Sequence, residues 1–343
     1  MRCLLETCGR AISPISLVLA CGIGAAACER PSGTPEPTPS LLDLGGVDDL
    51  ALSPDLSVMH GWTQVSTQYF WGVWGTGPND VWALGGSTYH YDGTRWSSVD
   101  AHGGMRAWGS GPSDVFTVGA ASGYLGTSSP IYHYDGTSWS LVANPTAEMD
   151  AVWGSGPRDV WATGVSTILH FDGTSWTKDV YQPGFRVSGL WGSGPRDVWA
   201  FSGAAVGPGS GARYAHFDGT AWADAVISGP ANARNDAMWG SAANDVWSVG
   251  DGLMHWNGVT WTRDPKFSSG TRFYGVWGTG PSDFWAVRED STVWHFDGTS
   301  WSDFGFPFSS TLRGIWGPAP IGSAPAPREL WVTGERGLYH YVP

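Results

Sequence analysis

The sequence predicts an all-β fold, a seven-bladed β-propeller, and three observations lead to this prediction. A Trp-Gly-x-Gly-Pro-x-Asp-Val-Trp motif recurs, with small variations, about every 40 residues, a period typical of four-stranded propeller blades. A His-aromatic-Asp/Asn-Gly signature follows it in each of the first six repeats. No segment shows a helical period over three turns. The first tryptophan of the motif stands at Trp74, Trp108, Trp153, Trp191, Trp239, Trp277 and Trp316.

Each repeat is expected to form four short strands, a to d. Strand a ends at the first Trp-Gly, and the Gly-x-Gly-Pro-x-Asp turn leads into strand b, for example residues 159–163. Strand c ends in the His-aromatic pair. The Asp-Gly that follows predicts a tight hairpin, because such turns need positive φ at their centre. Strand d carries the last tryptophan.

The two ends of the repeat region predict how the ring closes. The seventh repeat has Trp316, Trp331 and His340, but no strand d follows Tyr341. Gly61–Val65 has the pattern of a spare strand d in front of the first repeat. We therefore expect Gly61–Val65 to complete the last blade. Closing the ring in this way removes the free sheet edges of an open array.

The repeated polar and aromatic residues are expected to be structural. Twenty of the 23 tryptophans occupy three repeat positions, and we predict that they pack blade against blade. The Asp of the first turn is expected to accept hydrogen bonds from turn amides, because one Asp per blade does not cluster as calcium requires. The His of strand c is expected to bond that Asp or a backbone carbonyl rather than a metal. No metal and no cofactor are predicted.

Composition excludes several classes of protein. The formal net charge is -13 and the sequence has only two lysines, which argues against a nucleic-acid partner and against binding to anionic lipid surfaces. All four cysteines lie within the first 28 residues. A disulfide scaffold and a Cys-ligated metal site in the propeller are therefore excluded.

The N-terminal segment predicts export. Residues 1–28 combine Arg2 and Arg10 with an apolar run of about 17 residues, too short to favour a spanning helix, and small residues near its end. Ala-Ala-Ala-Cys28 resembles the lipobox of bacterial lipoproteins, so Cys28 is the expected lipidation site, with Cys21 as the alternative. That resemblance, with no Asp after either Cys, implies the outer membrane of a Gram-negative bacterium. The alternative is cleavage to a soluble secreted or periplasmic form.

The segment after the signal is expected to be a tether. Residues 29–40 are rich in Pro, Ser and Thr, and the acidic stretch that follows shows no period. Such compositions bury too little apolar surface to fold. We predict a disordered tether over residues 29–59 and the propeller over residues 60–343. The membrane is expected to be contacted only through the lipid anchor.

The repeats resemble those of Trp-rich bacterial lipoproteins, whose units read W-G-x-G-P-x-D-V-W-A-x-G, across nearly all of residues 61–343. More loosely, they are similar to tectonin-like and Asp-box (BNR-like) propellers. Asp-box turns carry Ser-x-Asp-x-Gly-x-x-Trp, whereas here Asp is followed directly by Gly. The chain therefore departs from the Asp-box pattern while sharing its hairpin position.

Function is expected where the repeats differ. The d–a and b–c connections share one face of the ring and vary, and two b–c loops, residues 119–130 and 203–213, are long. Arginines and aromatic residues gather just before the first tryptophans, at the expected mouth of the central channel. Together they suit a carboxylate, a phosphate or a sugar. The candidate ligand-binding residues are Trp71, Arg106, Asp150, Arg186, Asp236, Arg272, Tyr274 and Arg313.

Three functions fit this pattern. The first is a non-enzymatic, monomeric binding module at the cell surface or in the periplasm, with a glycan or protein partner. The second is a sialidase-like glycosidase that uses the arginine cluster. For it, Glu148, Asp150, Asp236 and Tyr274 are possible, but no spacing singles out a catalytic pair, so no catalytic residue is assigned. The third is a scaffold within the envelope.

Overall fold

The computed structural model describes residues 49–50, 61–100, 102–119, 129–202, 213–225, 234–267, 270, 272–318 and 329–343. Contacts divide the chain into residues 1–40 and 41–343, and all the described residues belong to the second unit. The regular elements among them are β-strands. In this part of the chain no helix is long and apolar enough to cross a membrane. The predicted signal segment, with both candidate lipidation sites Cys21 and Cys28, lies outside the described residues.

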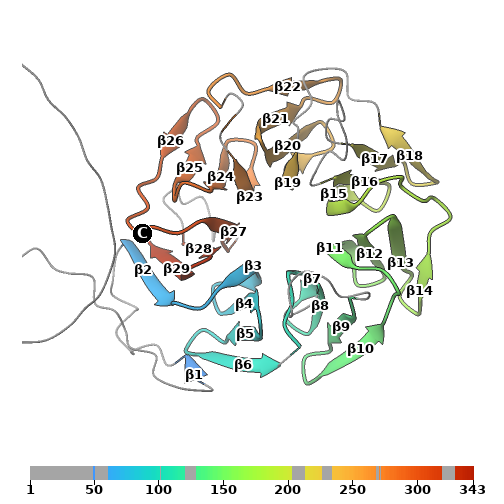
Figure 1. Ribbon diagram of the computed structural model, residues 1–343, viewed down its shortest axis with the longest axis horizontal. Helices are drawn as coiled ribbons and strands as arrows, with labels where there is room; N and C mark the ends of the chain where they lie inside the picture. Colours follow the sequence, from blue (N-terminus) through green and yellow to red (C-terminus); the bar gives the residue numbers. More distant parts are fainter. Residues whose placement is uncertain are drawn as a thin grey trace, which may run out of the picture. The chain divides into compact units, whose positions relative to one another are not determined.

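Seven antiparallel sheets follow one another around a ring, which confirms the predicted seven-bladed β-propeller (Figure 1). In each blade, strand a lies innermost and contacts strand a of the next blade. The blades, in strand order a to d, are β3 Phe70–Gly77, β4 Asp80–Gly85, β5 Thr88–Tyr91 and β6 Trp96–Asp100; β7 Arg106–Gly111, β8 Asp114–Val118, β9 Ile131–Tyr134 and β10 Trp139–Ala143; β11 Met149–Gly156, β12 Asp159–Gly164, β13 Thr167–Phe171 and β14 Trp176–Lys178; β15 Val187–Gly194, β16 Asp197–Ser202, β17 Tyr214–Phe217 and β18 Trp222–Ala225; β19 Asn235–Ala242, β20 Asp245–Gly250, β21 Gly252–Trp256 and β22 Trp261–Arg263; β23 Phe273–Gly280, β24 Asp283–Arg288, β25 Val293–Phe296 and β26 Trp301–Asp303; and β27 Leu312–Trp316, β28 Leu330–Gly334, β29 Gly337–Val342 and β2 Gly61–Ser66.

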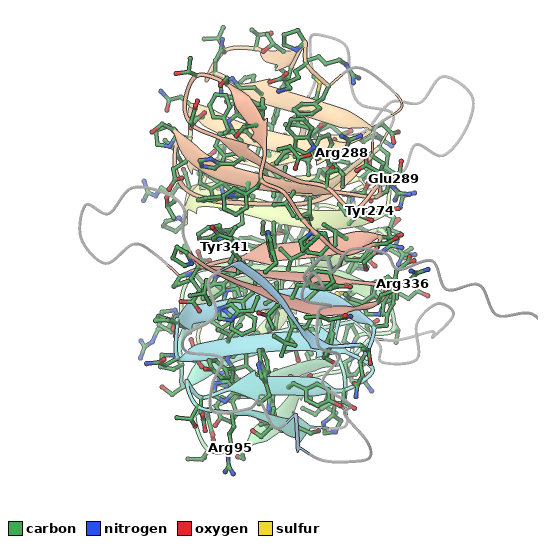
Figure 2. The ribbon with its side chains drawn as sticks, turned by 90° about the vertical axis from the view of Figure 1, so that its left-hand side faces the viewer. Arg95, Tyr274, Arg288, Glu289, Arg336 and Tyr341 are labelled. Atoms are coloured by element: carbon green, nitrogen blue, oxygen red, sulfur yellow. The ribbon has the colours of Figure 1, made fainter. Side chains whose placement is uncertain are left out.

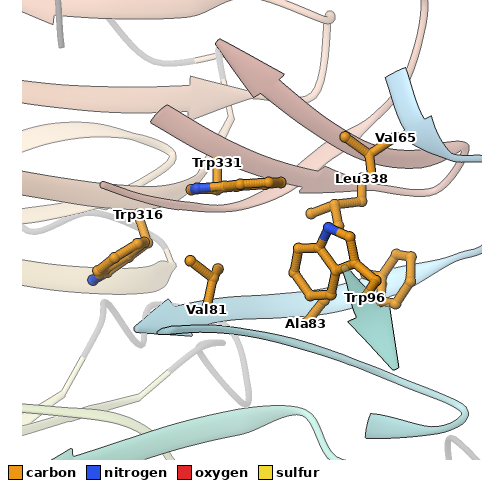
Figure 3. Packing of buried hydrophobic residues seen from close by; sticks show 8 residues of the cluster. Val65, Val81, Ala83, Trp96, Trp316, Trp331 and Leu338 are labelled. Carbon is orange, nitrogen blue, oxygen red and sulfur yellow. The ribbon is translucent and has the colours of Figure 1, made fainter. Parts of the chain in front are cut away.

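The N-terminal strand closes the ring, as predicted. β2 pairs antiparallel with β29, with Trp62 opposite Tyr341. The interface between blade 7 and blade 1 then buries Val65 and Leu338 together with Trp96 (Figure 3). One pairing was not predicted: Asp49–Leu50, within the expected tether, form β1 and add a fifth strand to blade 1 beside β6.

A tryptophan-on-glycine contact joins each blade to the next. The six-membered ring of Trp153 occupies the place where a Cβ on Gly192 would stand, 2.5 Å from Trp153 Cη2. The same relation joins every pair of neighbouring blades, including the closing pair, where a Cβ on Gly75 would stand 2.8 Å from Trp316 Cη2. The Trp-Gly dipeptide is therefore an interlocking element. Its tryptophan reaches forward to the next blade, and its glycine receives the tryptophan of the blade before.

The histidines and first-turn acids form one structural network in every blade. In blade 3, His170 Nε2 lies 2.6 Å from Asp159 Oδ1, and the ring of His170 stacks on Trp161 at 4.0 Å between centroids. Ser155 donates to the other carboxylate oxygen at 2.5 Å. The predicted His–Asp contact is thus confirmed, but the Asp bonds mainly side chains rather than the turn amides we expected. Burial alone would raise the pKa of Asp159, but the hydrogen bonds from His170 and Ser155 outweigh it and lower the pKa.

The c–d turns show the backbone-capping role that we expected at the first turn. Asp172 Oδ1 accepts hydrogen bonds from the amides of Thr174 and Ser175 at 2.8 and 2.9 Å, and from the Thr174 hydroxyl at 2.6 Å. These bonds lower the pKa of Asp172 to about 2. The following Gly173 has φ of 93°, as the sequence predicts, but the turn holds four residues between the paired Phe171 and Trp176.

Candidate functional site

A bulge recurs near the beginning of the inner strand, where most of the candidate residues lie. In six blades the register of strand a against strand b shifts by one residue. A bulge turns the extra side chain away from the normal alternation. The residues at the shift are Trp71, Asp150, Ser188, Asp236, Tyr274 and Arg313; blade 2 contributes Arg106, which pairs with Val118.

This face of the ring carries the d–a and b–c turns. In the side view, Tyr274 lies toward the same side as Arg288, Glu289 and Arg336 of two b–c turns, whereas Arg95 of a c–d turn lies toward the other side (Figure 2). The structure therefore places the candidate cluster on the face where the repeats vary. Most of both long b–c loops, residues 120–128 and 203–212, lies outside the described residues.

On blades 3 and 4 the cluster is an ion-pair group. Arg186 binds Asp150 through two hydrogen bonds, Nε to Oδ2 at 2.7 Å and Nη2 to Oδ1 at 2.6 Å. Its Nη1 lies 2.9 Å from Glu148 Oε2. Burial raises the pKa of Asp150, and the bonds to Arg186 offset this only in part. Arg186 is thus already matched by two carboxylates.

A second ion-pair group joins blades 5 and 6. Asp236 accepts from Arg272 through two hydrogen bonds, at 3.1 Å from Nε and 3.0 Å from Nη2. Arg234 Nε donates to the same carboxylate at 3.0 Å. Two guanidinium groups therefore share one largely buried carboxylate. Arg234 directly precedes β19 and was not among the predicted site residues; the structure shows that it belongs to this group.

Arginine and aromatic rings meet between blades 6, 7 and 1. The guanidinium carbons of Arg272 and Arg313 each lie 4.2 Å from the centroid of the Tyr274 ring. Arg313 also lies 5.9 Å from the Trp71 ring and donates from Nη2 to Glu335 at 2.5 Å. Cations over aromatic faces are attracted by the ring quadrupole. Glu335 was not a predicted site residue; it lies in the b–c turn of blade 7.

Arg106 differs from the other arginines of the cluster. Its Nη1 donates to the backbone carbonyls of Met105 at 3.0 Å and Trp71 at 3.4 Å, and no carboxylate among the described residues forms an ion pair with it. Burial lowers the pKa of Arg106, and attraction to Asp150 and Asp236 offsets this only in part. Asp236 lies on blade 5, three blades away from Arg106.

The structure brings the eight candidates into two connected groups. Asp150 and Arg186 form one, and Trp71, Asp236, Arg272, Tyr274 and Arg313 are linked through shared contacts into the other. Arg106 joins the second group through the carbonyl of Trp71. Among the described residues, no three His, Cys, Asp or Glu side chains are grouped so that they could hold a metal ion.

The fold is that of a β-propeller, a class in which a ring of blades surrounds a central axis. No family model and no curated protein sequence matches the chain. The resemblance of its repeats to Trp-rich bacterial lipoproteins therefore stays a prediction.

Solved propellers are similar in structure. YCF48 from Cyanidioschyzon merolae is 15% identical, with a TM-score of 0.61 over 82% of this chain and 99% of that one. A structure described as YCF48 bound to D1 peptide is 16% identical, with a TM-score of 0.61 over 83% of this chain and 98% of that one. The WD40 repeats of RRP9 are 8% identical, with a TM-score of 0.62 over 84% and 98% of the two chains. At these identities the likeness shows the fold alone.

Proposed function

We propose that this protein is a non-enzymatic binding module that takes a protein or glycan partner through the face carrying the d–a and b–c turns. The observation that carries the proposal is the arginine–aromatic cluster of Trp71, Arg106, Arg272, Tyr274 and Arg313. These residues come from four consecutive blades and interrupt the repeat pattern. Clustered Arg and aromatic side chains are the groups most enriched in the energetic centres of protein interfaces. A protein of the same fold, YCF48, has been solved with a bound peptide, which supports a protein partner in general.

Binding is favoured over glycoside hydrolysis. A glycosidase needs one carboxyl group to donate a proton and a second group to act as nucleophile or base. The candidate carboxylates Asp150 and Asp236 are instead each held by two hydrogen bonds from one arginine. This arrangement fixes charge and geometry at a surface, as an interface requires.

The binding test compares the two faces of the ring. The exported protein is screened against envelope proteins and against a glycan array, and each hit is repeated with the Arg313→Glu and Arg95→Glu variants. Arg95 serves as the control because it is exposed on the c–d turn face. We expect Arg313→Glu to abolish binding and Arg95→Glu to leave it unchanged. Equal effects of the two variants would refute the proposed face, and the absence of any partner or hydrolysis would favour an envelope scaffold.

The location is a second part of the proposal: the protein is exported and held at the outer membrane by a lipid on Cys28. The apolar segment and the Ala-Ala-Ala-Cys28 sequence support it. Changing Cys28 to Ser should release the protein from the membrane fraction, whereas Cys21→Ser should not. The reverse result would move the anchor to Cys21, and retention of both variants would contradict lipid anchoring.

A further inference from the structure

The arginines of the cluster differ in how many carboxylate partners they have. Across blades 3 to 6, the arginines at positions 186, 234 and 272 are bound by Glu148, Asp150 and Asp236. On blades 7, 1 and 2 the described arginines of the cluster are Arg106 and Arg313, and of these two Arg313 alone forms an ion pair, with Glu335 of an exposed turn. The side of the ring around Trp71 therefore keeps a cationic excess, in a protein whose net charge is -13.

On this side of the ring, an arginine N–H donor also lacks a hydrogen-bond partner among the described residues. The Nε of Arg313 is buried and has no hydrogen-bond partner among the described residues. Arg106 donates from Nη1 to two backbone carbonyls. A buried donor without a partner costs about 1–3 kcal/mol in general, so a donor such as Arg313 Nε is normally satisfied by a ligand or by water.

Arg106 and Arg313 both contact Trp71. Arg106 donates to the carbonyl of Trp71, and the guanidinium carbon of Arg313 lies 5.9 Å from the centroid of its ring. Backbone carbonyls hold the Arg106 guanidinium, and the guanidinium carbon of Arg313 lies 4.2 Å from the centroid of the Tyr274 ring. Arginine binds carboxylates through paired N–H donors, so guanidinium groups fixed in this way are suited to a carboxylate ligand.

We infer that Arg106 and Arg313 form a carboxylate-binding site, and that its ligand is a carboxylate of a polypeptide, either a C-terminus or an Asp or Glu side chain. The inference rests on the proposed binding function and names the chemistry of its partner. The aromatic rings argue against a sugar as the occupant. Tyr274 lies under two guanidinium groups, and Trp71 meets Tyr69 edge-on at 4.5 Å, so these rings support arginines rather than offer a stacking platform.

The net charge of the protein and the position of the site further restrict the kind of carboxylate that is expected to bind. A net charge of -13 repels a polyanion, so a single carboxylate is favoured over a sulfated or polyacidic chain. The site lies where the inner strands of seven blades begin around one axis. A group carried at the end of a chain, or on an extended side chain, reaches such a position most readily.

The experiment probes the full exported protein with short random peptides, displayed as one set with free C-terminal carboxylates and an identical set with C-terminal amides. Each binding peptide is also tested with its Asp and Glu changed to Asn and Gln. We expect affinity to fall by about tenfold or more when the responsible carboxylate is removed, since a hydrogen bond to a charged group contributes about that much. Loss on amidation assigns a C-terminus, and loss on side-chain substitution assigns Asp or Glu.

Protein variants complete the test. Arg106→Gln and Arg313→Gln should each reduce binding by a similar factor, whereas Arg95→Gln should not. Thermal unfolding of each variant shows whether a loss of binding reflects loss of the site or loss of the fold. Arg106→Lys keeps the positive charge without the planar guanidinium, so it should bind only partly as well as the unchanged protein.

Three results would overturn the inference. Peptides that bind equally well without any carboxylate, but still lose binding in Arg313→Glu, contradict the carboxylate site and leave the proposed binding face intact. Binding to acidic glycans alone contradicts the polypeptide ligand. Absence of any peptide or glycan ligand contradicts both the inference and the proposed function.

Discussion

The contact between tryptophan and glycine at each blade junction predicts how much a substitution of the glycine lowers the free energy of unfolding. In the Gly192→Ala variant, the added Cβ would stand 2.5 Å from Trp153 Cη2 and 2.7 Å from the carbonyl oxygen of Asp197. The carbonyl belongs to the first residue of β16 and cannot move without disturbing the pairing of Gly194 with Asp197. Overpacking of this kind costs about 1–3 kcal/mol. We expect a loss in this range in the free energy of unfolding.

Gly194 provides a matched control on the same strand. A Cβ at this position meets nothing within 4 Å, and its φ lies outside the left-handed region. Gly194→Ala should therefore be neutral or stabilise by about 0.4–1 kcal/mol, because it restricts the unfolded chain. Urea denaturation followed by tryptophan fluorescence measures both variants. Equal stability of the two would refute the interlocking role of the glycine.

The same comparison can be made at the closure of the ring. Gly75→Ala places a Cβ 2.8 Å from Trp316 Cη2, whereas Gly77→Ala meets nothing within 4 Å. The same Cβ would stand 2.4 Å from the Asp80 carbonyl oxygen of blade 1 itself. We therefore expect Gly75→Ala, and not Gly77→Ala, to destabilise the protein, and equal stability of the two variants would contradict the close packing at Gly75.

Three further predictions follow from the network, the turns and the closing strand. His170→Gln removes both the bond to Asp159 and the stacking on Trp161, and should lower the free energy of unfolding by about 1–3 kcal/mol in urea titrations; a change within error would show that the network is incidental. Because the pKa of Asp172 is lowered to about 2 in the folded chain, its stabilising effect is complete above its unfolded pKa of about 4 and is lost as pH falls through 2. Asp172→Asn, which copies Asn257 of blade 5, should therefore weaken the pH dependence of the urea midpoint between these values; an unchanged slope would contradict the assignment. Deleting Gly61–Val65 exposes the edge of β29 and should abolish cooperative thermal unfolding, whereas deletion of residues 29–40 should not; equal melting curves would disprove closure by β2.

Local pattern was sufficient for the scaffold because each blade is a repeat of short-range features. The turn signals, the period of about 40 residues and the unpaired Gly61–Val65 strand predicted seven blades and their closure before any contact was known. The same reasoning identified the structural role of His170, since one histidine per blade cannot cluster into a metal site. It predicted the contact of His170 with Asp159 but expected turn amides as the other partners of this carboxylate, whereas the hydroxyl of Ser155 takes that place in the folded blade.

The sequence by itself determined the fold, the blade count and the face on which the repeats vary. Only the tertiary structure decided which arginines are matched and which remain available. Arg186 precedes β15 and Arg106 begins β7, yet Arg186 is held by Asp150 of the preceding blade and Arg106 donates to backbone carbonyls. Asp150 and the carbonyl of Trp71 each come from a neighbouring blade, so these contacts form only when the blades pack side by side in the ring. The repeat pattern does not reveal this difference, and the difference is the reason why we propose a ligand beside Trp71.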